Sequence, residues 1–570
     1  MYSDVGFEPR NIGDVDVVYH DGVFHLFHLV LPNHDYIAHA VSDDGLNWRR
    51  VKNALFIGDP GEWDDDALWT MNVSGDPDKP GSWRMFYTGL SRREGGRIQR
   101  VGLAVSDDLI HWTKVDDGKY PIDVADGGET FYESSLHEGR KWVSFRDPLF
   151  FCDAEKRYLL VSGRVKHGPV IRRGCVAVVE EVERDRWEFR PPLYHPRRYD
   201  DVEVPGLFKM SGHYFLLGSI REDVKVRYWY SDSLKGPWRN YFDNVLLPQG
   251  NYAARTCVYP MEAQELDAEG NPTGEAITSG DVCDTDNCGR LVFNFYFTGS
   301  SPAASKYGQA RNLMPPPKRL AVHPDGRLML KSFDGFDKAV RRTLHADQLA
   351  PLRPIANNPD SSVGSNDLDC WFGSDAGFET FLLQGDYRDF RMRGKLRLEG
   401  RGKCGLVFRL DEPTTGGYYL SLDLQKGLAQ LRSWKSFATA AEEEEHGVGA
   451  LSIANSPNAQ LPVAGPPMGG PIGGPASGAD AGLGENAFKF SAIQNANFLS
   501  KREGPWEIEL VAYGRYLEFS VDGYVRLTLV DDTFRDGKLG FYAETAHIRV
   551  DDLTVEHLHA PADEAAGLTA

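Results

Sequence analysis

Three carboxylates that lie far apart in the chain occur in similar local sequence. Asp14, Asp147 and Glu203 each precede a segment that alternates apolar and aromatic residues, so we expect each acid at the start of a strand. Hydrolysis of a glycosidic bond needs one carboxylate opposite the anomeric carbon of the sugar and a carboxylic acid beside the leaving oxygen. If the fold brings these three acids together, they can supply that chemistry.

Each acid also has an ordinary structural interpretation. Asp14 could be a turn former at a strand start, and Asp147 could end a loop, because Asp before Pro favours turns. Glu203 could belong to a solvated acidic loop, since Asp200 and Asp201 lie close to it in the chain. The catalytic interpretation therefore depends on a fold that gathers distant strand starts.

A recurrent strand pattern predicts such a fold. An apolar run followed by Ser-Asp and then Trp occurs at 40–48 and 104–112, and a looser copy lies at 230–238. Repeats at this spacing indicate the blades of a β-propeller, although a set of ordinary hairpins is the alternative. Further strand-like clusters bring the expected number of blades to five, of which the first, third and fourth begin with the three acids. In a propeller the innermost strands surround one axial funnel, where these acids can meet.

The remainder of the chain has a different pattern. Residues 346–363 are rich in Pro, Asn, Asp and Ser and are interpreted as a linker. Residues 364–560 contain alternating segments typical of antiparallel strands, which predict a two-sheet sandwich. An insertion at about 437–487 is acidic and then rich in Gly, Pro and Ala, so we expect it to be disordered. The predicted fold class is all-β, with a five-bladed β-propeller over residues 1–345 followed by a C-terminal β-sandwich.

The composition argues against some partners. The 570 residues include 83 acidic and 63 basic side chains, and the formal net charge of −20 repels nucleic acid phosphates and anionic headgroups. No segment approaches the roughly 18 consecutive apolar residues of a membrane helix, and the N-terminus lacks the basic and apolar regions of a signal peptide. We therefore expect no nucleic acid or membrane partner, and a cytoplasmic protein, or a secreted one if a leader has been removed.

The cysteines argue against a metal site. There are seven of them, and an odd number cannot be fully paired within one chain, which favours a reducing compartment. Cys283 and Cys288 are the closest pair, but no second pair matches them as a zinc site would require. We expect neither a metal nor a cofactor.

Several segments carry a resemblance to a known family, and they occur in the same order as in that family. With Asp14 they are GVFHLF at 22–27, EWDDDALWT at 62–70, RDP at 146–148, EVPGLF at 203–208, YAART at 252–256, PKRL at 317–320 and DGRL at 325–328. This series resembles glycoside hydrolase family 32, the five-bladed fructofuranosidases. The resemblance implies that Asp14 is the nucleophile, that Asp147 orients sugar hydroxyls and steadies positive charge, and that Glu203 is the general acid and base.

Six further residues are predicted to bind substrate. Arg146 could donate paired hydrogen bonds to sugar hydroxyls or to a carboxylate. Some of the others have a structural alternative, because a Trp can fill a blade core and an Asp can bond a turn. The predicted substrate-binding residues are Asp16, Trp63, Asp66, Trp69, Arg146 and Arg255.

Some departures from family 32 leave the substrate open. Residues 11–13 and 15–17 replace the Trp-Met-Asn and Pro-Asn-Gly that flank the nucleophile, and Val204 replaces the Cys after the acid/base. The segment DVDVV at 14–18 also resembles the start of family 43, the inverting arabinosidases and xylosidases.

The leading hypothesis is a retaining exo-β-fructofuranosidase, or an enzyme that transfers fructosyl units, with a small oligosaccharide or a fructan as substrate. One alternative is an inverting arabinofuranosidase or xylosidase of the family 43 type. Another is a non-catalytic carbohydrate-binding protein, against which the presence of all three acids argues. The acidic segment from Glu442 could also reach a neighbouring subunit, so a homo-oligomer remains open.

Overall fold

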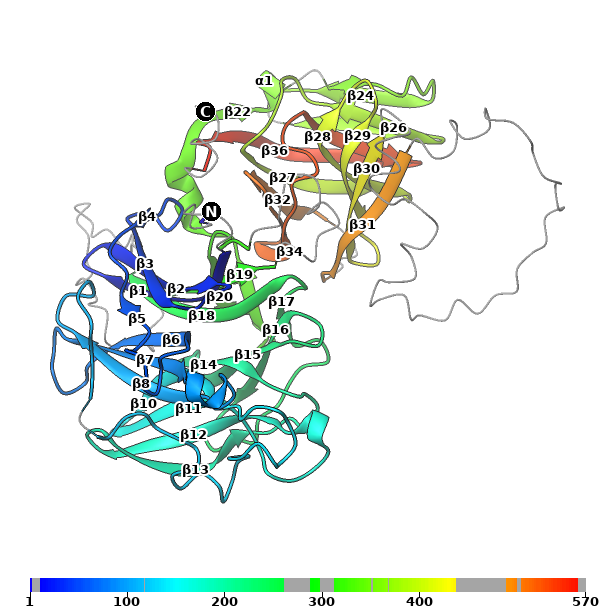
Figure 1. The fold of residues 1–570 in the computed structure, drawn as a ribbon. Coiled ribbons are helices and arrows are strands. Elements are labelled where there is room, and N and C mark those ends of the chain that lie inside the picture. Colours follow the sequence, from blue (N-terminus) through cyan, green and yellow to red (C-terminus); the bar gives the residue numbers. More distant parts are fainter. Residues whose placement is uncertain are drawn as a thin grey trace, which may run out of the picture.

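The computed structural model describes residues 1–2, 11–116, 118–260, 288–297, 312–349, 352–367, 369–436, 488–499 and 504–561. These residues form a five-bladed β-propeller and a β-sandwich, so the predicted fold class is confirmed. In Figure 1 the propeller, coloured blue to green, lies below the sandwich, coloured mostly yellow to red. The predicted disordered insertion at about 437–487 lies outside the described residues.

Each blade is an antiparallel sheet whose strands follow one another in the chain. The first blade has β1 (Asn11–His20), β2 (Val23–Leu31), β3 (Tyr36–Ser42), β4 (Arg49–Arg50) and β5 (Leu55–Phe56), and the second has β6 (Ala67–Gly75), β7 (Trp83–Leu90), β8 (Arg100–Ser106) and β9 (Thr113–Lys114). The third has β10 (Arg146–Asp153), β11 (Lys156–Arg164), β12 (Gly174–Glu183) and β13 (Arg186–Tyr194). The fourth has β14 (Glu203–Met210), β15 (His213–Ile220), β16 (Lys225–Ser231) and β17 (Val245–Leu247), and the fifth has β18 (Asn251–Pro260), β19 (Cys288–Tyr296), β20 (Lys318–Val322) and β21 (Leu328–Lys331).

The first strands of the five blades are the innermost ones. Strand β1 contacts β6, β6 contacts β10, β10 contacts β14, β14 contacts β18, and β18 returns to β1. This closed ring places five strand starts around one axis.

The repeated Ser-Asp segments form the same turn in two blades. Asp44 accepts hydrogen bonds from the backbone N–H groups of residues 46 and 47, at 2.8 and 2.7 Å. Asp108 accepts the equivalent bonds from residues 110 and 111, at 2.9 and 2.7 Å. The repeat therefore marks the turn after the third strand of a blade, as its sequence predicts.

The sandwich consists of two sheets. One contains β22 (Val340–His345), β24 (Ser361–Ser365), β25 (Cys370–Ser374), β27 (Phe390–Glu399), β32 (Trp506–Tyr513), β33 (Tyr516–Val521), β34 (Tyr524–Val530) and β36 (His547–Leu558). The other contains β23 (Arg353–Pro354), β26 (Phe378–Leu382), β28 (Lys403–Asp411), β29 (Gly416–Asp423), β30 (Leu428–Ser436), β31 (Phe488–Asn497) and β35 (Lys538–Glu544).

The predicted domain boundary and linker need correction. Strand β22, which was assigned to the propeller, pairs with β36 of the sandwich. The segment 346–363, interpreted as a linker, contains the short helix α1 (Ala346–Leu349) and strand β23, and enters β24. These two strands lie at the edges of the sandwich sheets, so this segment belongs to the sandwich.

The propeller and the sandwich share one hydrophobic core. A single buried cluster extends from Phe24 of the first blade through Phe293 of the fifth blade and Phe336 to Tyr513 and Leu558 of the sandwich.

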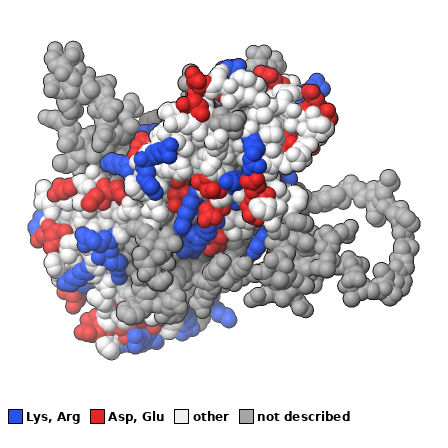
Figure 2. Space-filling view, turned by 90° about the horizontal axis from the view of Figure 1, so that it is seen from above, with Lys and Arg blue, Asp and Glu red and all other residues white. Residues whose placement is uncertain are grey.

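Acidic and basic side chains are interspersed on the face shown in Figure 2. Among the described residues, no helix is both long enough and apolar enough to cross a membrane.

Candidate active site

The three predicted acids line one pocket. Asp14 lies on β1, Asp147 on β10 and Glu203 on β14, and all three face a pocket of about 210 Å³ at the strand starts. The other residues that line it are Gly13, Leu29, Leu31, His34, Trp69, Thr70, Arg146, Val204, Tyr252, Phe295 and Phe297. The closed ring of innermost strands thus brings together side chains from all five blades.

A β-bulge occurs at the same place in every blade. The pairing of the first and second strands is interrupted between Ile12 and Val15, and between Trp69 and Met71. Equivalent interruptions follow Arg146, Glu203 and Tyr252 in the other three blades. A bulge bends the strand and redirects its side chains, so the five bulges turn the polar groups toward the axis.

The backbone at three of these bulges adopts a conformation that L-residues rarely take. The φ angles of Asp147, Val204 and Ala253 are 61°, 48° and 53°. Such strained residues persist where the surrounding structure holds them in place, and they concentrate at functional sites.

Asp14 lies in surroundings that favour its protonated form. Its pKa is raised to about 7, first because the protein excludes water from the carboxyl group and next because the charge of Asp147 is close. The hydroxyl of Thr70 donates a hydrogen bond to Asp14 Oδ2, which partly opposes this increase. Asp14 therefore ionises at higher pH than an ordinary aspartate.

Glu203 is held between the guanidinium group of Arg146 and the phenol of Tyr252. Arg146 Nη2 donates to Oε1 of Glu203 at 2.5 Å, and the hydroxyl of Tyr252 donates to Oε2. Burial raises the pKa of Glu203, Arg146 opposes this, and the charge of Asp147 adds to the increase. A carboxyl group with a raised pKa can remain protonated and act as a general acid.

Asp147 is fixed by the backbone of the next blade. The N–H of Val204 donates to Asp147 Oδ2 at 3.0 Å, and Arg146 Nε lies 3.5 Å from the same oxygen. The carboxylate is therefore oriented toward the pocket by residues of two blades.

The structure places two of the six predicted substrate-binding residues in the pocket. Trp69 lines it beside His34, with ring centroids 5.6 Å apart. Arg146 also lines it, and its guanidinium group contacts the carboxylates of Glu203, Asp201 and Asp147. Of the two roles predicted for Arg146, the structure shows the contact with carboxylates.

Asp16 and Arg255 lie behind the pocket. Asp16 accepts hydrogen bonds from the backbone N–H of Val73 at 2.6 Å and from Asn72 at 3.1 Å, which joins the first blade to the second. Arg255 is buried and donates to the main-chain carbonyl groups of Pro148 and Pro205, at 2.7 and 2.6 Å. In place of the predicted contact with substrate, the geometry gives both side chains a supporting role.

Trp63 and Asp66 are also outside the residues that line the pocket. The ring of Trp63 stacks on Tyr87 with centroids 5.7 Å apart, within the second blade. The Asp66 carboxylate is partly exposed and lies 3.9 Å from Arg92. These positions are those of the structural alternatives for Trp and Asp, and the contact of either residue with substrate stays a prediction.

The prediction missed three polar residues of the pocket, His34, Thr70 and Tyr252. Thr70 and Tyr252 hydrogen bond to Asp14 and Glu203, respectively. Both lie inside segments that carried the family resemblance, at the end of EWDDDALWT and at the start of YAART. The sequence gave no sign that Thr70 contacts Asp14 or that Tyr252 contacts Glu203, because the two residues of each pair come from different blades.

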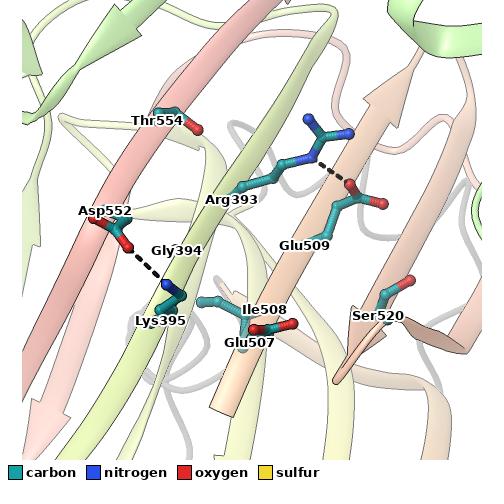
Figure 3. A pocket seen from close by; sticks show the side chains of 10 residues that line it. Arg393, Gly394, Lys395, Glu507, Ile508, Glu509, Ser520, Asp552 and Thr554 are labelled. Carbon is teal, nitrogen blue, oxygen red and sulfur yellow. Dashed lines mark hydrogen bonds and ion pairs between the residues drawn. The ribbon is translucent and has the colours of Figure 1, made fainter. Parts of the chain in front are cut away.

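A second and larger cavity lies on the sandwich. It has a volume of about 420 Å³ and is lined by residues of β27, β32, β33 and β36 (Figure 3). Its charged groups are largely paired, with Arg393 Nε 2.6 Å from Glu509 and Lys395 Nζ 2.8 Å from Asp552. The side chains of Arg393, Lys395 and Asp552 are also 42–59% exposed. In the funnel pocket the Asp147 and Glu203 side chains are only 3% and 12% exposed, and burial of this kind shifts the protonation of carboxyl groups, so the funnel pocket is the candidate active site. Within the described ranges, no group of three or more His, Cys, Asp or Glu side chains is placed to hold a metal ion.

A comparison with known protein families gives a match over the segment that carries the three acids of this pocket. Residues 14–271 match the glycosyl hydrolases family 32 N-terminal domain. The matched range begins at Asp14 and includes Asp147 and Glu203. This match agrees with the resemblance seen in the sequence, and the resemblance to family 43 is not supported.

One curated relative and several solved structures are similar to the chain. A levanase from Bacillus sp. (strain L7) is 31% identical over 156 residues, which make up 26% of this chain and 16% of the levanase. Fructan 1-exohydrolase IIa from Cichorium intybus has a TM-score of 0.59 at 12% identity, over 98% of this chain and 97% of that one. The family 32 β-fructofuranosidase of Bombyx mori has a TM-score of 0.57 at 13% identity, over 96% and 92% of the two chains. At these identities the structural likeness shows that the fold is shared.

Proposed function

We propose that the protein is a glycoside hydrolase that acts on fructosides. The observation that carries this proposal is the convergence of Asp14, Asp147 and Glu203 in one pocket, within the range that matches family 32. Two carboxyl groups on either side of a glycosidic bond are the machinery of this reaction.

In the proposed mechanism Glu203 and Asp14 act on the same bond. Glu203 transfers its proton to the leaving oxygen while the Asp14 carboxylate attacks the anomeric carbon, which breaks the glycosidic bond and forms a covalent fructosyl ester. Water then gives a proton to Glu203 and attacks the ester, which releases the sugar and restores Asp14. An acceptor sugar in place of water would give transfer, so hydrolysis and transfer share the intermediate.

The surroundings of the acids support these roles. Asp147, oriented by Val204 and Arg146, places a negative charge beside the positive charge that develops on the sugar ring. The raised pKa of Glu203 keeps a proton available for the leaving group.

We infer that the substrate is a small fructose-containing oligosaccharide. The chains of similar fold include a fructan 1-exohydrolase in complex with 1-kestose and a fructofuranosidase in complex with fructosylnystose. A pocket of about 210 Å³ favours an enzyme that takes one terminal sugar unit at a time.

A substrate panel tests the proposal. The protein would be incubated with sucrose, a β-2,1 fructan, a β-2,6 fructan and a nitrophenyl arabinofuranoside, and the anomers of the first products would be followed by NMR. We expect fructose released with retained configuration. Arabinose with inverted configuration, and no fructose from any substrate, would reject the proposal.

A further inference from the structure

A buried chain of alternating charges ends at Glu203. Arg140 contacts Asp201, Asp201 contacts Arg146, and Arg146 contacts Glu203, with shortest N···O distances of 2.8, 3.3 and 2.5 Å. Asp201 lies two residues before Glu203 in the chain and is 3% exposed. It is absent from the residues that line the pocket, so it influences the substrate only through its effects on Arg146 and Glu203.

Asp201 is held as an anion. Arg140 Nη2 donates to both of its carboxylate oxygens at 2.9 Å, and Arg140 Nη1 donates to Oδ2 at 2.8 Å. Although burial opposes ionisation, Arg146 and Arg140 keep the pKa of Asp201 below its ordinary value. A buried carboxylate with two guanidinium partners carries its charge through the whole pH range of enzyme activity.

The position of Arg146 creates a difficulty for a general acid. A guanidinium group 2.5 Å from a carboxyl group favours its ionised form, which would remove the proton that Glu203 must donate. The negative charge of Asp201 on the other side of Arg146 offsets this effect, and it adds to the increase in the pKa of Glu203.

We propose that Asp201 is a positioning residue that balances the charge of Arg146, so that Glu203 stays protonated while Arg146 remains beside the substrate. This inference rests on the proposed function of Glu203. The charged and titratable groups around Glu203 and Asp201 are Asp14, Arg140, Arg146, Asp147, Arg164, Cys175, Asp200, Arg221 and Tyr252.

The variant Asp201→Asn keeps the shape of the side chain and removes its charge. We expect the alkaline limb of kcat/KM for sucrose, or for the fructan that the wild-type enzyme hydrolyses best, to move to lower pH by about one unit. This shift is about a tenfold loss of kcat/KM above the limb. Fructosyl fluoride provides a second readout, because fluoride leaves without a proton. With this substrate the loss should largely disappear.

The matched control is Asp200→Asn. Asp200 also contacts Arg140, at 2.7 Å, but its side chain is 36% exposed and its second ion-pair partner is Arg164. Its pH profile should coincide with that of the wild-type enzyme. Near-ultraviolet circular dichroism and thermal unfolding would compare the folds of both variants.

The outcomes separate the inference from the function on which it rests. An unchanged pH profile for Asp201→Asn, or an equal loss on both substrates without a shift, would overturn the inference. If Asp201→Asn does not fold, Asp201→Ser gives the same test, since it also removes the negative charge beside Arg146, and an alkaline limb that stays at the wild-type position would overturn the inference. Failure of the wild-type enzyme to release fructose would instead reject the proposed function.

Discussion

At the scale of single residues, the pocket is a set of carboxyl groups whose neighbours push their protonation in different directions. Burial and the charge of Asp147 raise the pKa of Asp14, and the hydroxyl of Thr70 lowers it again. The two carboxyl oxygens of Glu203 accept hydrogen bonds from the guanidinium group of Arg146 and from the hydroxyl group of Tyr252. In the proposed mechanism Asp14 must be ionised and Glu203 protonated, so kcat/KM should fall on both sides of a pH optimum.

The variant Thr70→Val tests the contribution of one hydrogen bond. Valine keeps the branched shape but cannot donate to Asp14, so the ionised form of Asp14 loses support and its pKa rises. Because the nucleophile must be ionised, the acid limb of kcat/KM should move to higher pH, by about one unit.

Thr88→Val is the control for that variant. Thr88 is also buried, but its hydroxyl group accepts a hydrogen bond from the backbone N–H of Asp147 rather than donating to Asp14. Its acid limb should stay at the wild-type position. A limb that is unmoved in Thr70→Val would show that this bond has no influence on the nucleophile.

The sequence allowed the prediction that the three acids converge, because a propeller gathers its strand starts on one axis. It did not allow the partners of these acids to be found. Thr70 and Tyr252 lie at bulges that redirect their side chains toward Asp14 and Glu203. A bulge shifts the alternation of a strand by one residue, and the sequence alone did not show where that shift falls. For the same reason Asp16 could not be distinguished from a residue that faces the funnel.

At the scale of elements, the residues at the five bulges meet in one pocket only if the blades keep fixed positions relative to one another. Arg84 of β7 is one residue that joins two blades. It is fully buried, donates to Glu181 of β12 at 2.9 and 3.2 Å and to Asp185 at 2.8 Å, and lies over the ring of Phe150. It thus connects the second blade to the third, whose first strand carries Asp147.

The variant Arg84→Met should destabilise the propeller. It leaves the Glu181 carboxylate buried without its main counter-charge, and removal of one partner of a buried ion pair costs about 3–5 kcal/mol. The midpoint of urea unfolding, followed by tryptophan fluorescence, should fall accordingly.

Lys156→Met is the matched control on the neighbouring strand. Lys156 pairs with Glu180 at 2.8 Å, but its side chain is 63% exposed, and exposed pairs contribute little to stability. Equal midpoints for the Arg84 and Lys156 variants would contradict a structural role for the buried network.

At the scale of the whole molecule, the sandwich packs against the propeller through one shared core. Lys318, at the start of β20 in the fifth blade, is buried against the sandwich, with its Nζ 4.9 Å from the centroid of the Tyr516 ring. It interacts electrostatically with Glu518, which is also buried. This charged pair therefore joins the two bodies at their boundary, as does Asn251 of β18, whose Nδ2 donates to the carbonyl group of Thr528 in β34 at 3.3 Å.

The variant Lys318→Met tests this contact. Without the ammonium group Glu518 remains buried and must bind a proton, so we expect a loss of about 3–5 kcal/mol in the free energy of unfolding. Lys331→Met is the control at the same boundary, since Lys331 lies 5.6 Å from the Tyr524 ring and is only partly buried. Urea midpoints that are the same for both variants would contradict the role of Lys318.

The domain boundary was the least predictable part of the fold. Strands β23 and β24 are edge strands whose residues are mostly exposed, so they lack the apolar alternation that marked the other strands. The Pro, Asn, Asp and Ser content of residues 346–363 therefore favoured the interpretation as a linker. The blades and the central strands of the sandwich were predictable because they bury one or both faces.

The most direct test of the central claim is fructose release by the wild-type protein and by the variants Asp14→Asn and Glu203→Gln, with folding checked by circular dichroism. We predict that the wild-type protein releases fructose from sucrose or a fructan. We also predict that Glu203→Gln is slower by about 10²–10⁴-fold and that Asp14→Asn is at least as impaired. Rates of either folded variant equal to the wild-type rate would contradict the assignment of these acids as the catalytic groups.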